Sequence, residues 1–359
     1  MPNQRDIARV LGVNQATVSL ALRGDRSVSE RVRRRVRETA ERLGYRPNAY
    51  VSSLMAHIRS GRRPSAEGVL AVLVKARSEA EWRSTESYRV YHEGMTRRAE
   101  ELGFRIECFF FEERGMSAQI VDRILEARGI QGVILAPPYP GNRALKMRWE
   151  RYACVGMGHG WEPQQLDRVA NDHAQNVLTA FAELDRLGYS RVGFLLGGLA
   201  AKGGRGLRWL PGFLEAQSRL PARRRLPLYT GGLERSDAGP FHSWVSTHRP
   251  EVVLVLTGQA QSWIEALGYR IPADCGLACL VRPQEGNFAG IDEKNVVLGV
   301  AAVELVASRI ARNEFGLPRH PLLTVIDGRW IDGPTAASRG AAHRDEQSGS
   351  CRREKVRAR

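Results

Sequence analysis

The chain has 359 residues and a formal net charge of +15 at pH 7, so it is long enough for two or three domains and favours an anionic partner. No stretch approaches the roughly 20 apolar residues of a membrane span, and no apolar signal segment follows Met1. The five cysteines are scattered and lack zinc-ligand spacing. We therefore expect a cytoplasmic protein with no metal site, no cofactor and no membrane partner.

The first 44 residues have the pattern of three short helices. Ile7, Ala8 and Leu11 form one apolar face of the first helix, Gly12 permits a tight turn, and Asn14 can cap the second helix. The second helix has an inner face of Val18, Ala21 and Leu22 and a mostly polar outer face. A third helix is expected from Ser29 to Gly44, with Val32, Val36, Ala40 and Leu43 buried.

Charge favours a nucleic-acid partner for this region. Residues 1–63 contain 14 arginines, no lysine and five acidic residues. A basic face of that density suits phosphate neutralisation. The alternative is an ordinary pair of short helices around a glycine, whose solvated faces would more often mix the two signs.

From residue 68 the pattern changes to short apolar strands that alternate with amphipathic helices. This rhythm is typical of parallel sheets covered on both faces. Strands are expected at 68–74, 105–111, 132–136, 152–155, 191–196, 227–230, 251–256 and 276–281, and helices at 88–102, 118–127, 175–187, 211–218, 241–247, 262–267 and 296–312. The sequence predicts two α/β lobes, each with a parallel sheet, and a cleft between them.

The composition divides the chain into four parts. We expect a helix-turn-helix domain at 1–46, a hinge helix and linker at 47–63, a bilobed core at 64–335 and a disordered basic tail at 336–359. The tail shows no leucine heptads, so no added coiled coil is predicted.

Residues 3–56 resemble the LacI/GalR family of bacterial transcriptional regulators. The resemblance rests on Asp6-Ile7-Ala8, Gly12-Val13, Thr17-Val18-Ser19, Leu22, Val28-Ser29, Arg33, Val36, Ala40 and the run from Leu43 to Asn48. A weaker, collinear resemblance covers 68–334. It implies a periplasmic-binding-protein-like core, a homodimer on a pseudo-palindromic double-stranded DNA operator, and a repressor whose activity a small molecule in the cleft modulates. A ligand-independent regulator or an architectural DNA-binding protein is the alternative.

The resemblance also assigns residues to DNA. Gln15, Ala16 and Leu20 face the bases; Gln15 can bond adenine, whereas Ala16 and Leu20 offer apolar contact only. The family usually has Arg at the position of Leu20, so we expect half-sites that lack the guanine this Arg reads. Phosphate contacts are implied for Asn3, Asn14, Thr17, Ser19, Ser29 and Tyr45.

The hinge, Pro47 to Ala56, is too short for a stable isolated helix and is expected to fold when two copies pack on DNA. Leu54 matches the family's minor-groove wedge, and Met55 replaces the usual small residue beside it. The alternative is that Leu54 only anchors the hinge to the core.

The family's sugar ligands are largely missing from the cleft. Trp209 with Arg208, Thr257 with Gly258, and Val281 stand where sugar-binding members carry polar ligands, and Glu293, preceded by Asp292, stands where Gln is common. We take Arg208, Trp209, Asp172, Thr257, Asp292 and Glu293 as candidate effector residues. Arg208, Asp292 and Glu293 could equally be solvated surface charges, Trp209 a core residue, and Asp172 a support for the connection between lobes.

Other classes fit less well. We find no nucleophile elbow and no phosphate loop, and Gly156-Met157-Gly158-His159-Gly160 falls short of a dinucleotide fingerprint, so no enzyme is predicted. A secreted solute-binding protein is disfavoured by the missing signal segment and the fused DNA-binding unit. The sequence leaves open the effector, the target genes, the choice between repression and activation, and any role of the tail.

Overall fold

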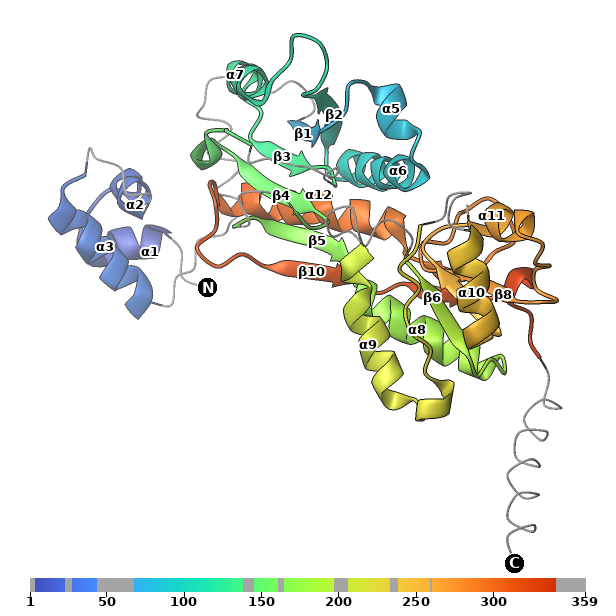
Figure 1. The fold of residues 1–359 in the computed structure, drawn as a ribbon. Helices are drawn as coiled ribbons and strands as arrows, with labels where there is room; N and C mark the ends of the chain where they lie inside the picture. Colours follow the sequence, from blue (N-terminus) through green and yellow to red (C-terminus); the bar gives the residue numbers. More distant parts are fainter. Residues whose placement is uncertain are drawn as a thin grey trace, which may run out of the picture. The chain divides into compact units, whose positions relative to one another are not determined.

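The structure is a computed structural model that describes residues 4–22, 28–43, 68–137, 145–160, 165–196, 206–232, 238–258 and 260–339. The chain divides into two compact units, Met1–Pro64 and Ser65–Ile310 with Glu314–Arg359. Each unit is described by itself (Figure 1). The hinge at 47–63 and most of the expected tail, 340–359, lie outside the described residues.

The first unit is the expected trihelical domain. Its helices are α1 (Gln4–Leu11), α2 (Gln15–Leu22) and α3 (Glu30–Arg42). Ile7, Val18 and Val36, one from each helix, are fully buried against one another in its core. Gly12 takes a left-handed φ of +65° after α1, and the backbone N–H of Val13 donates to the carbonyl of Ala8 (3.1 Å). The turn therefore closes α1 and starts α2 within three residues.

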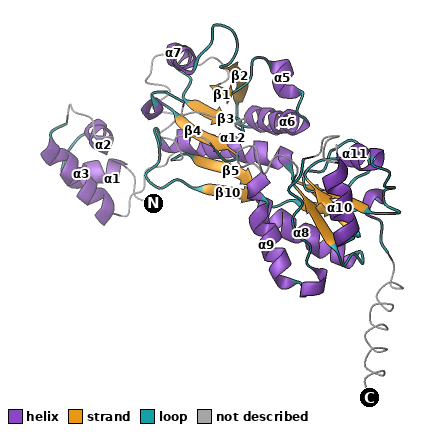
Figure 2. Ribbon diagram, viewed as in Figure 1, coloured by secondary structure: helices purple, strands orange, loops and turns teal. Residues whose placement is uncertain are grey.

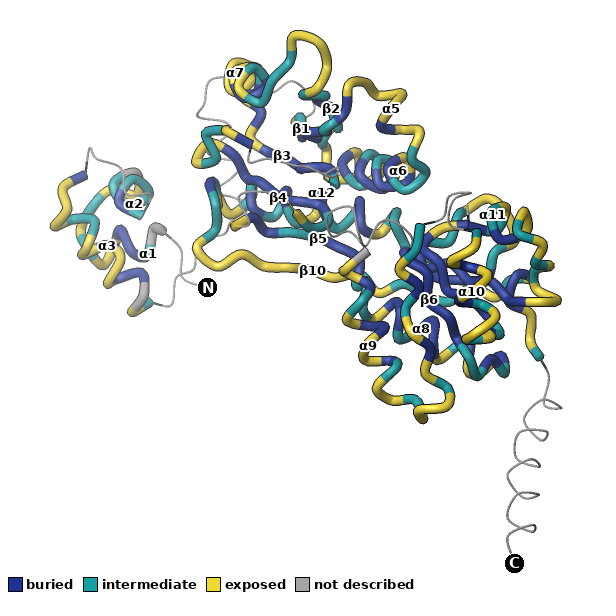
Figure 3. Tube along the Cα trace, viewed as in Figure 1, coloured by how far each residue is buried: buried dark blue, intermediate teal, exposed yellow. Residues whose placement is uncertain are grey.

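The second unit opens with a parallel sheet. Its strands are ordered β10-β5-β4-β3-β1-β2 and are β1 (Gly68–Val74), β2 (Phe104–Phe110), β3 (Gly132–Leu135), β4 (Ala153–Met157), β5 (Asp167–Asn171) and β10 (Leu323–Ile326). Neighbouring strands of this sheet all pair in parallel. The inner strands are the dark, buried centre of this lobe in Figure 3, because helices cover both faces.

Alternating side chains of β1 show how the helices divide between the two faces. Leu70 and Val72 pack with α6 (Glu86–Glu101) and α12 (Asn295–Arg312), whereas Ala71 and Leu73 pack with α7 (Ala118–Arg128) (Figure 2). The period of two in a strand places neighbouring residues on opposite faces. A short helix, α5 (Glu79–Arg83), precedes α6 and was not predicted.

The second sheet is mixed, which corrects the expectation of two parallel sheets. Its order is β11-β9-β8-β7-β6, with β6 (Val192–Leu195), β7 (Val252–Val255), β8 (Gly276–Cys279), β9 (Ala289–Asp292) and β11 (Arg329–Ile331). β11 pairs antiparallel to β9 because the chain enters this lobe a last time from β10. The strand expected at 227–230 is only an isolated bridge between Leu195 and Tyr229.

Four helices cover the second sheet. α8 (His173–Arg186) and α9 (Leu210–Arg219) share one core, while α10 (Ala238–His248) and α11 (Ala260–Ala266) share another. Cys275 and Cys279 are buried, and burial raises the pKa of each thiol to about 12. No helix in the described part of the chain is long and apolar enough to cross a membrane.

Candidate functional site

The chain passes between the two sheets three times among the described strands, from β5 to α8, from β9 to α12 and from β10 to β11. Hydrogen bonds join these three connections to one another. Asn171 Nδ2 donates to the carbonyl oxygen of Glu293 (2.8 Å), and Asp172 N donates to that of Ile326 (3.1 Å). Gly328 N donates to Asn176 Oδ1 (2.9 Å). The lobes are therefore connected through one hydrogen-bonded joint.

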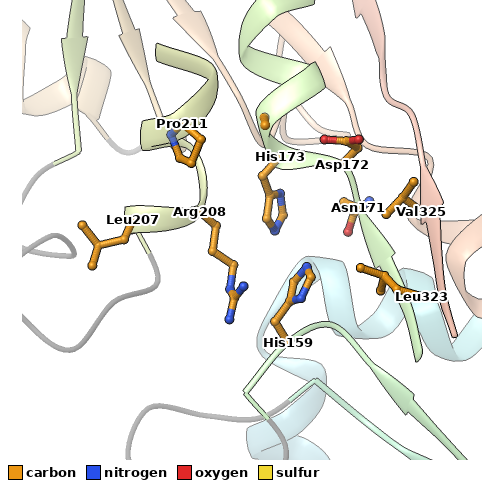
Figure 4. A pocket seen from close by; sticks show the side chains of 10 residues that line it. His159, Asn171, Asp172, His173, Leu207, Arg208, Pro211, Leu323 and Val325 are labelled. Carbon is orange, nitrogen blue, oxygen red and sulfur yellow. The ribbon is translucent and has the colours of Figure 1, made fainter. Parts of the chain in front are cut away.

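A pocket of about 530 Å³ lies beside this joint. Its walls come from the β4–β5 connection, the start of α8, the short turn before α9, and β10. The lining residues are His159, Asn171, Asp172, His173, Ala174, Leu207, Arg208, Pro211, Leu323 and Val325. Figure 4 shows the side chains of His159, His173 and Arg208 directed toward a common space. Such a volume suits a small organic molecule.

His173 is held from two sides. Its ring centroid lies 4.1 Å from that of Trp209, with the planes tilted by 30°. Its Nδ1 lies 3.3 Å from Glu293 Oε1, and the Glu293 side chain is only 4% exposed. Trp209 is itself 9% exposed and belongs to the core of the second lobe. These contacts fix the imidazole at the pocket wall and tie it to the β9–α12 connection.

The pocket is electropositive. Burial, reinforced by the nearby Arg208 guanidinium, lowers the pKa of His159 from 6.5 to about 4, so this imidazole is neutral at pH 7. Burial and the neighbouring Arg168 also lower the pKa of Arg208. Among the described residues no group of three or more His, Cys, Asp and Glu side chains could hold a metal ion.

Two of the six candidate effector residues line the pocket, namely Arg208 and Asp172. The Asp172 carboxylate also caps α8 by accepting from Gln175 N (2.9 Å). Trp209 and Glu293 lie behind His173 and act on the pocket through it. The burial of Glu293 shows that it is not a solvated surface charge.

Asp292 and Thr257 are not brought into the pocket. Asp292 accepts from Arg329 Nε (3.2 Å) and from Lys294 N (3.0 Å), which secures the β9–α12 connection to β11. Thr257 is exposed after β7, and its carbonyl accepts from Ala260 N (3.4 Å). Asp292 and Thr257 therefore make local structural contacts and do not line the pocket.

His159, His173 and Asn171 line the pocket but were absent from the candidates. For Asn171 and His173 the signal was their adjacency to Asp172 at the expected lobe crossover. His159 follows β4, at the carboxyl edge of a parallel strand where ligand-binding residues commonly lie.

The described residues assigned to DNA lie on α2 or directly before it, except Ser29, which directly precedes α3. Asn14, Gln15 and Ser29 are exposed, and Thr17 and Ser19 are half-buried. Leu20 is half-buried and packs against the core of the three-helix domain. Ala16 lies on α2. Asn3, Tyr45, Leu54 and Met55 lie outside the described residues.

A helix-turn-helix unit and a two-lobed α/β core in one chain define the class of DNA-binding transcriptional regulators. Residues 4–48 match the family model for bacterial regulatory proteins of the lacI family. The chain is 25% identical over 327 residues to the HTH-type transcriptional regulator PtxS of Pseudomonas putida, covering 88% of this chain and 91% of PtxS. It is 26% identical over 202 residues to the HTH-type transcriptional regulator GalR of Lacticaseibacillus casei, covering 56% of this chain and 55% of GalR.

The fold is similar to that of the lac repressor dimer bound to operator and the anti-inducer ONPF. The TM-score is 0.52 at 16% identity, over 94% of this chain and 99% of that chain. Residues 4–48 therefore form a DNA-binding domain of the lacI type, and the chain as a whole has a fold similar to that of the lac repressor.

Proposed function

We propose that this regulator binds a pseudo-palindromic operator as a homodimer in the cytoplasm, and that a small molecule in the pocket between its lobes modulates this binding. The carrying observation is α2 itself, a short helix with Gln15 exposed at its start and Val18 and Ala21 buried beneath it. A helix held in this way can enter a major groove with its N-terminal residues at the base edges. Two-fold symmetry of the dimer would impose the same symmetry on the DNA.

Gln15 supplies the polar base contact in this proposal. Its amide can pair with the N6 and N7 atoms of adenine. Leu20 offers only an apolar contact, and its packing against the domain core limits its reach. Ala16 adds an apolar surface, while Asn3, Asn14, Thr17, Ser19, Ser29 and Tyr45 position the domain on phosphates.

Selection on random duplexes tests this assignment with the full-length chain. We expect inverted half-sites without the guanine that the family's usual Arg reads, and Leu20→Arg should restore a preference for that guanine worth about 1–3 kcal/mol. Recovery of the guanine by the wild-type chain would contradict the role of Leu20. Absence of any enriched motif, with equal affinity for bulk DNA, would instead favour the architectural alternative.

The joint between the lobes supports effector control. His173 contacts both the pocket and Glu293, and Asn171 bonds the backbone of the same Glu293, so an occupant could bias the relative orientation of the lobes. That orientation would set the spacing of the two hinges, residues 47–63, and so their folding on DNA. Light scattering of the free protein tests the dimer, since a monomer at micromolar concentration would contradict it.

A ligand-independent regulator is the second candidate. It is disfavoured because a pocket lined by a guanidinium, two imidazoles and an amide keeps polar groups partly out of water, which costs free energy unless a partner meets them. A thermal-shift screen distinguishes the two: no stabilisation by any of a broad set of metabolites would favour the ligand-independent form.

A further inference from the structure

We infer that the effector is an organic anion whose carboxylate or phosphate group binds between Arg208, His159 and His173. This inference rests on the proposed function, because it names the class of ligand for the same pocket. The three side chains come from three separate elements, the β4–β5 connection, the first residue of α8 and the turn before α9, yet point into one space (Figure 4).

The guanidinium of the pocket is not neutralised by any carboxylate of the described residues. Among the described residues Arg208 has no carboxylate within ion-pair distance, whereas Arg329 pairs with Asp292 and Arg148 with Asp122. A guanidinium presents a planar fork of donors that matches a carboxylate or a phosphate. Arg208 is therefore available to a ligand in a way that those paired arginines are not.

Among the described residues, Asp172 is the one carboxylate that lines the pocket, and it is already engaged. Asp172 Oδ1 accepts from the backbone N–H of Gln175 and so stabilises the first turn of α8. Glu293 does not line the pocket and lies behind His173, on the side of the lobe joint. The space in front of the two imidazoles is therefore bordered by the N–H donors of Arg208 and by ring nitrogens of His159 and His173 that can become hydrogen-bond donors.

Electrostatics favour an incoming negative charge. Burial and the neighbouring guanidinium of Arg168, on β5, lower the pKa of Arg208. Burial and the field of Arg208 also lower the pKa of His159 to about 4. An anion would relieve this repulsion and could draw a proton onto His159.

The remaining walls describe the rest of the ligand. Leu207, Pro211, Leu323 and Val325 provide apolar surface, and Asn171 spends its amide N–H on Glu293 and Asn295. A neutral sugar would find few free partners for its hydroxyls here. The geometry fits a charged head group attached to a compact body, within a volume of about 530 Å³.

The experiment compares anions with neutral analogues of the same skeleton, using the full-length protein. The pairs are 4-hydroxybenzoate with 4-hydroxybenzyl alcohol, gluconate with sorbitol, and glucose 6-phosphate with glucose, all at one ionic strength. Thermal shift identifies the pair that binds, and calorimetry gives its affinity. The carboxylates and the phosphate ester form separate arms and so distinguish the two head groups.

We expect at least one anion to raise the melting temperature at millimolar concentration while its neutral partner does not. Arg208→Gln should weaken that anion by about tenfold to a hundredfold, because a charge-assisted hydrogen bond is lost. The matched control is Arg219→Gln at the end of α9, where the guanidinium is exposed and already pairs with Glu215.

Three results would overturn the inference: equal stabilisation by a neutral partner, full affinity in Arg208→Gln, or no response to any anion. None of them touches the DNA proposal, which is tested by selection on random duplexes without a ligand. Conversely, a chain that binds the anion but enriches no DNA motif would keep this inference as a property of the pocket and reject the proposed operator.

Discussion

The imidazole of His173 and the indole of Trp209 lie face to face, with ring centroids 4.1 Å apart and planes tilted by 30°. Trp209 ends the turn before α9 and His173 begins α8, so this contact joins the starts of two helices. One ring is buried in the lobe core and the other faces the pocket. The core of the lobe therefore sets the position of a pocket residue.

Removing the indole of Trp209 should lower the unfolding free energy of the second lobe and also free the imidazole of His173 from its fixed position at the pocket wall. Trp209→Ala is expected to cost about 3–5 kcal/mol of unfolding free energy, as for other buried aromatic truncations. Trp209→Phe keeps a ring against His173 and should retain most of the stability and any ligand response. Urea unfolding of both variants measures the difference, and equal stabilities would contradict the contact's importance.

His159 should make the core sensitive to acid. Its folded pKa of about 4 lies below the unfolded value of 6.5, so the unfolded chain gains a proton first as the pH falls. The stability it contributes is present above about pH 6.5 and is lost between pH 6.5 and pH 4. Arg208, His173 and Arg168 oppose protonation, and Asp172 favours it weakly.

His159→Gln should flatten the loss of stability in that window. The control is His320→Gln, an exposed position after α12. Denaturant midpoints measured at pH 7.5, 6 and 5 test the expectation. A wild-type and a His159→Gln profile that run parallel would show that His159 does not titrate in this range.

Arg309 and Asp167 form a buried ion pair between α12 and β5, with side chains 3% and 7% exposed. Arg309 Nη2 also donates to the carbonyl of Gly316 (2.9 Å), and Leu322 N donates to Asp167 Oδ1 (2.8 Å). Arg309→Met leaves a buried carboxylate without its cation and should cost about 3–5 kcal/mol. Arg312→Met, at the exposed end of the same helix, should change the unfolding free energy by well under half of that.

Gly212 lets α8 and α9 approach closely. A Cβ there would lie 2.3 Å from the carbonyl oxygen of Ala174, which is backbone and cannot move aside cheaply. Gly212→Ala should therefore destabilise the second lobe by about 1–3 kcal/mol and weaken ligand binding, since Ala174 and Pro211 line the pocket. Gly239→Ala, in α10 with nothing within 4 Å of the added carbon, is the matched control.

Leu54→Ala tests the proposed minor-groove wedge, which lies outside the described residues. We expect weaker operator binding and nearly unchanged binding to nonspecific DNA, because the wedge acts only on a kinked site. Fluorescence anisotropy on both duplexes at one salt concentration measures this. Equal losses on the two DNAs would favour a role for Leu54 as an anchor.

The sequence was most informative where structure is local. Val18, Val36 and the left-handed Gly12 follow from short-range periodicity and turn chemistry, and the three-helix domain was predicted with small errors in its bounds. The strands β1 to β4 and β6 to β8 were also predicted, because uniformly apolar runs leave few alternatives. β5 and β9 were missed, although most of their residues are buried.

Partners distant in sequence were not predictable. β10 and β11 were missed. β10 is an exposed edge strand, although Leu322–Ile326 has an apolar pattern that could have indicated it, and β11 has only three residues. The antiparallel pairing of β11 depends on a third crossing between the lobes. The position of His173 at the pocket wall depends on its contacts with Trp209 and Glu293, and no local sequence pattern links these three positions.

Asn171, Asp172 and His173 are consecutive, and their side chains have different roles. Asn171 donates to the β9–α12 connection, Asp172 caps α8, and His173 is directed into the pocket. Under the proposed function, a substitution at His173 would change the ligand specificity of the pocket without breaking the hydrogen bond of Asn171 or the helix cap of Asp172. A designer who changes the ligand specificity of this scaffold could likewise substitute His173 but would have to keep Asp172, the residue directly before it.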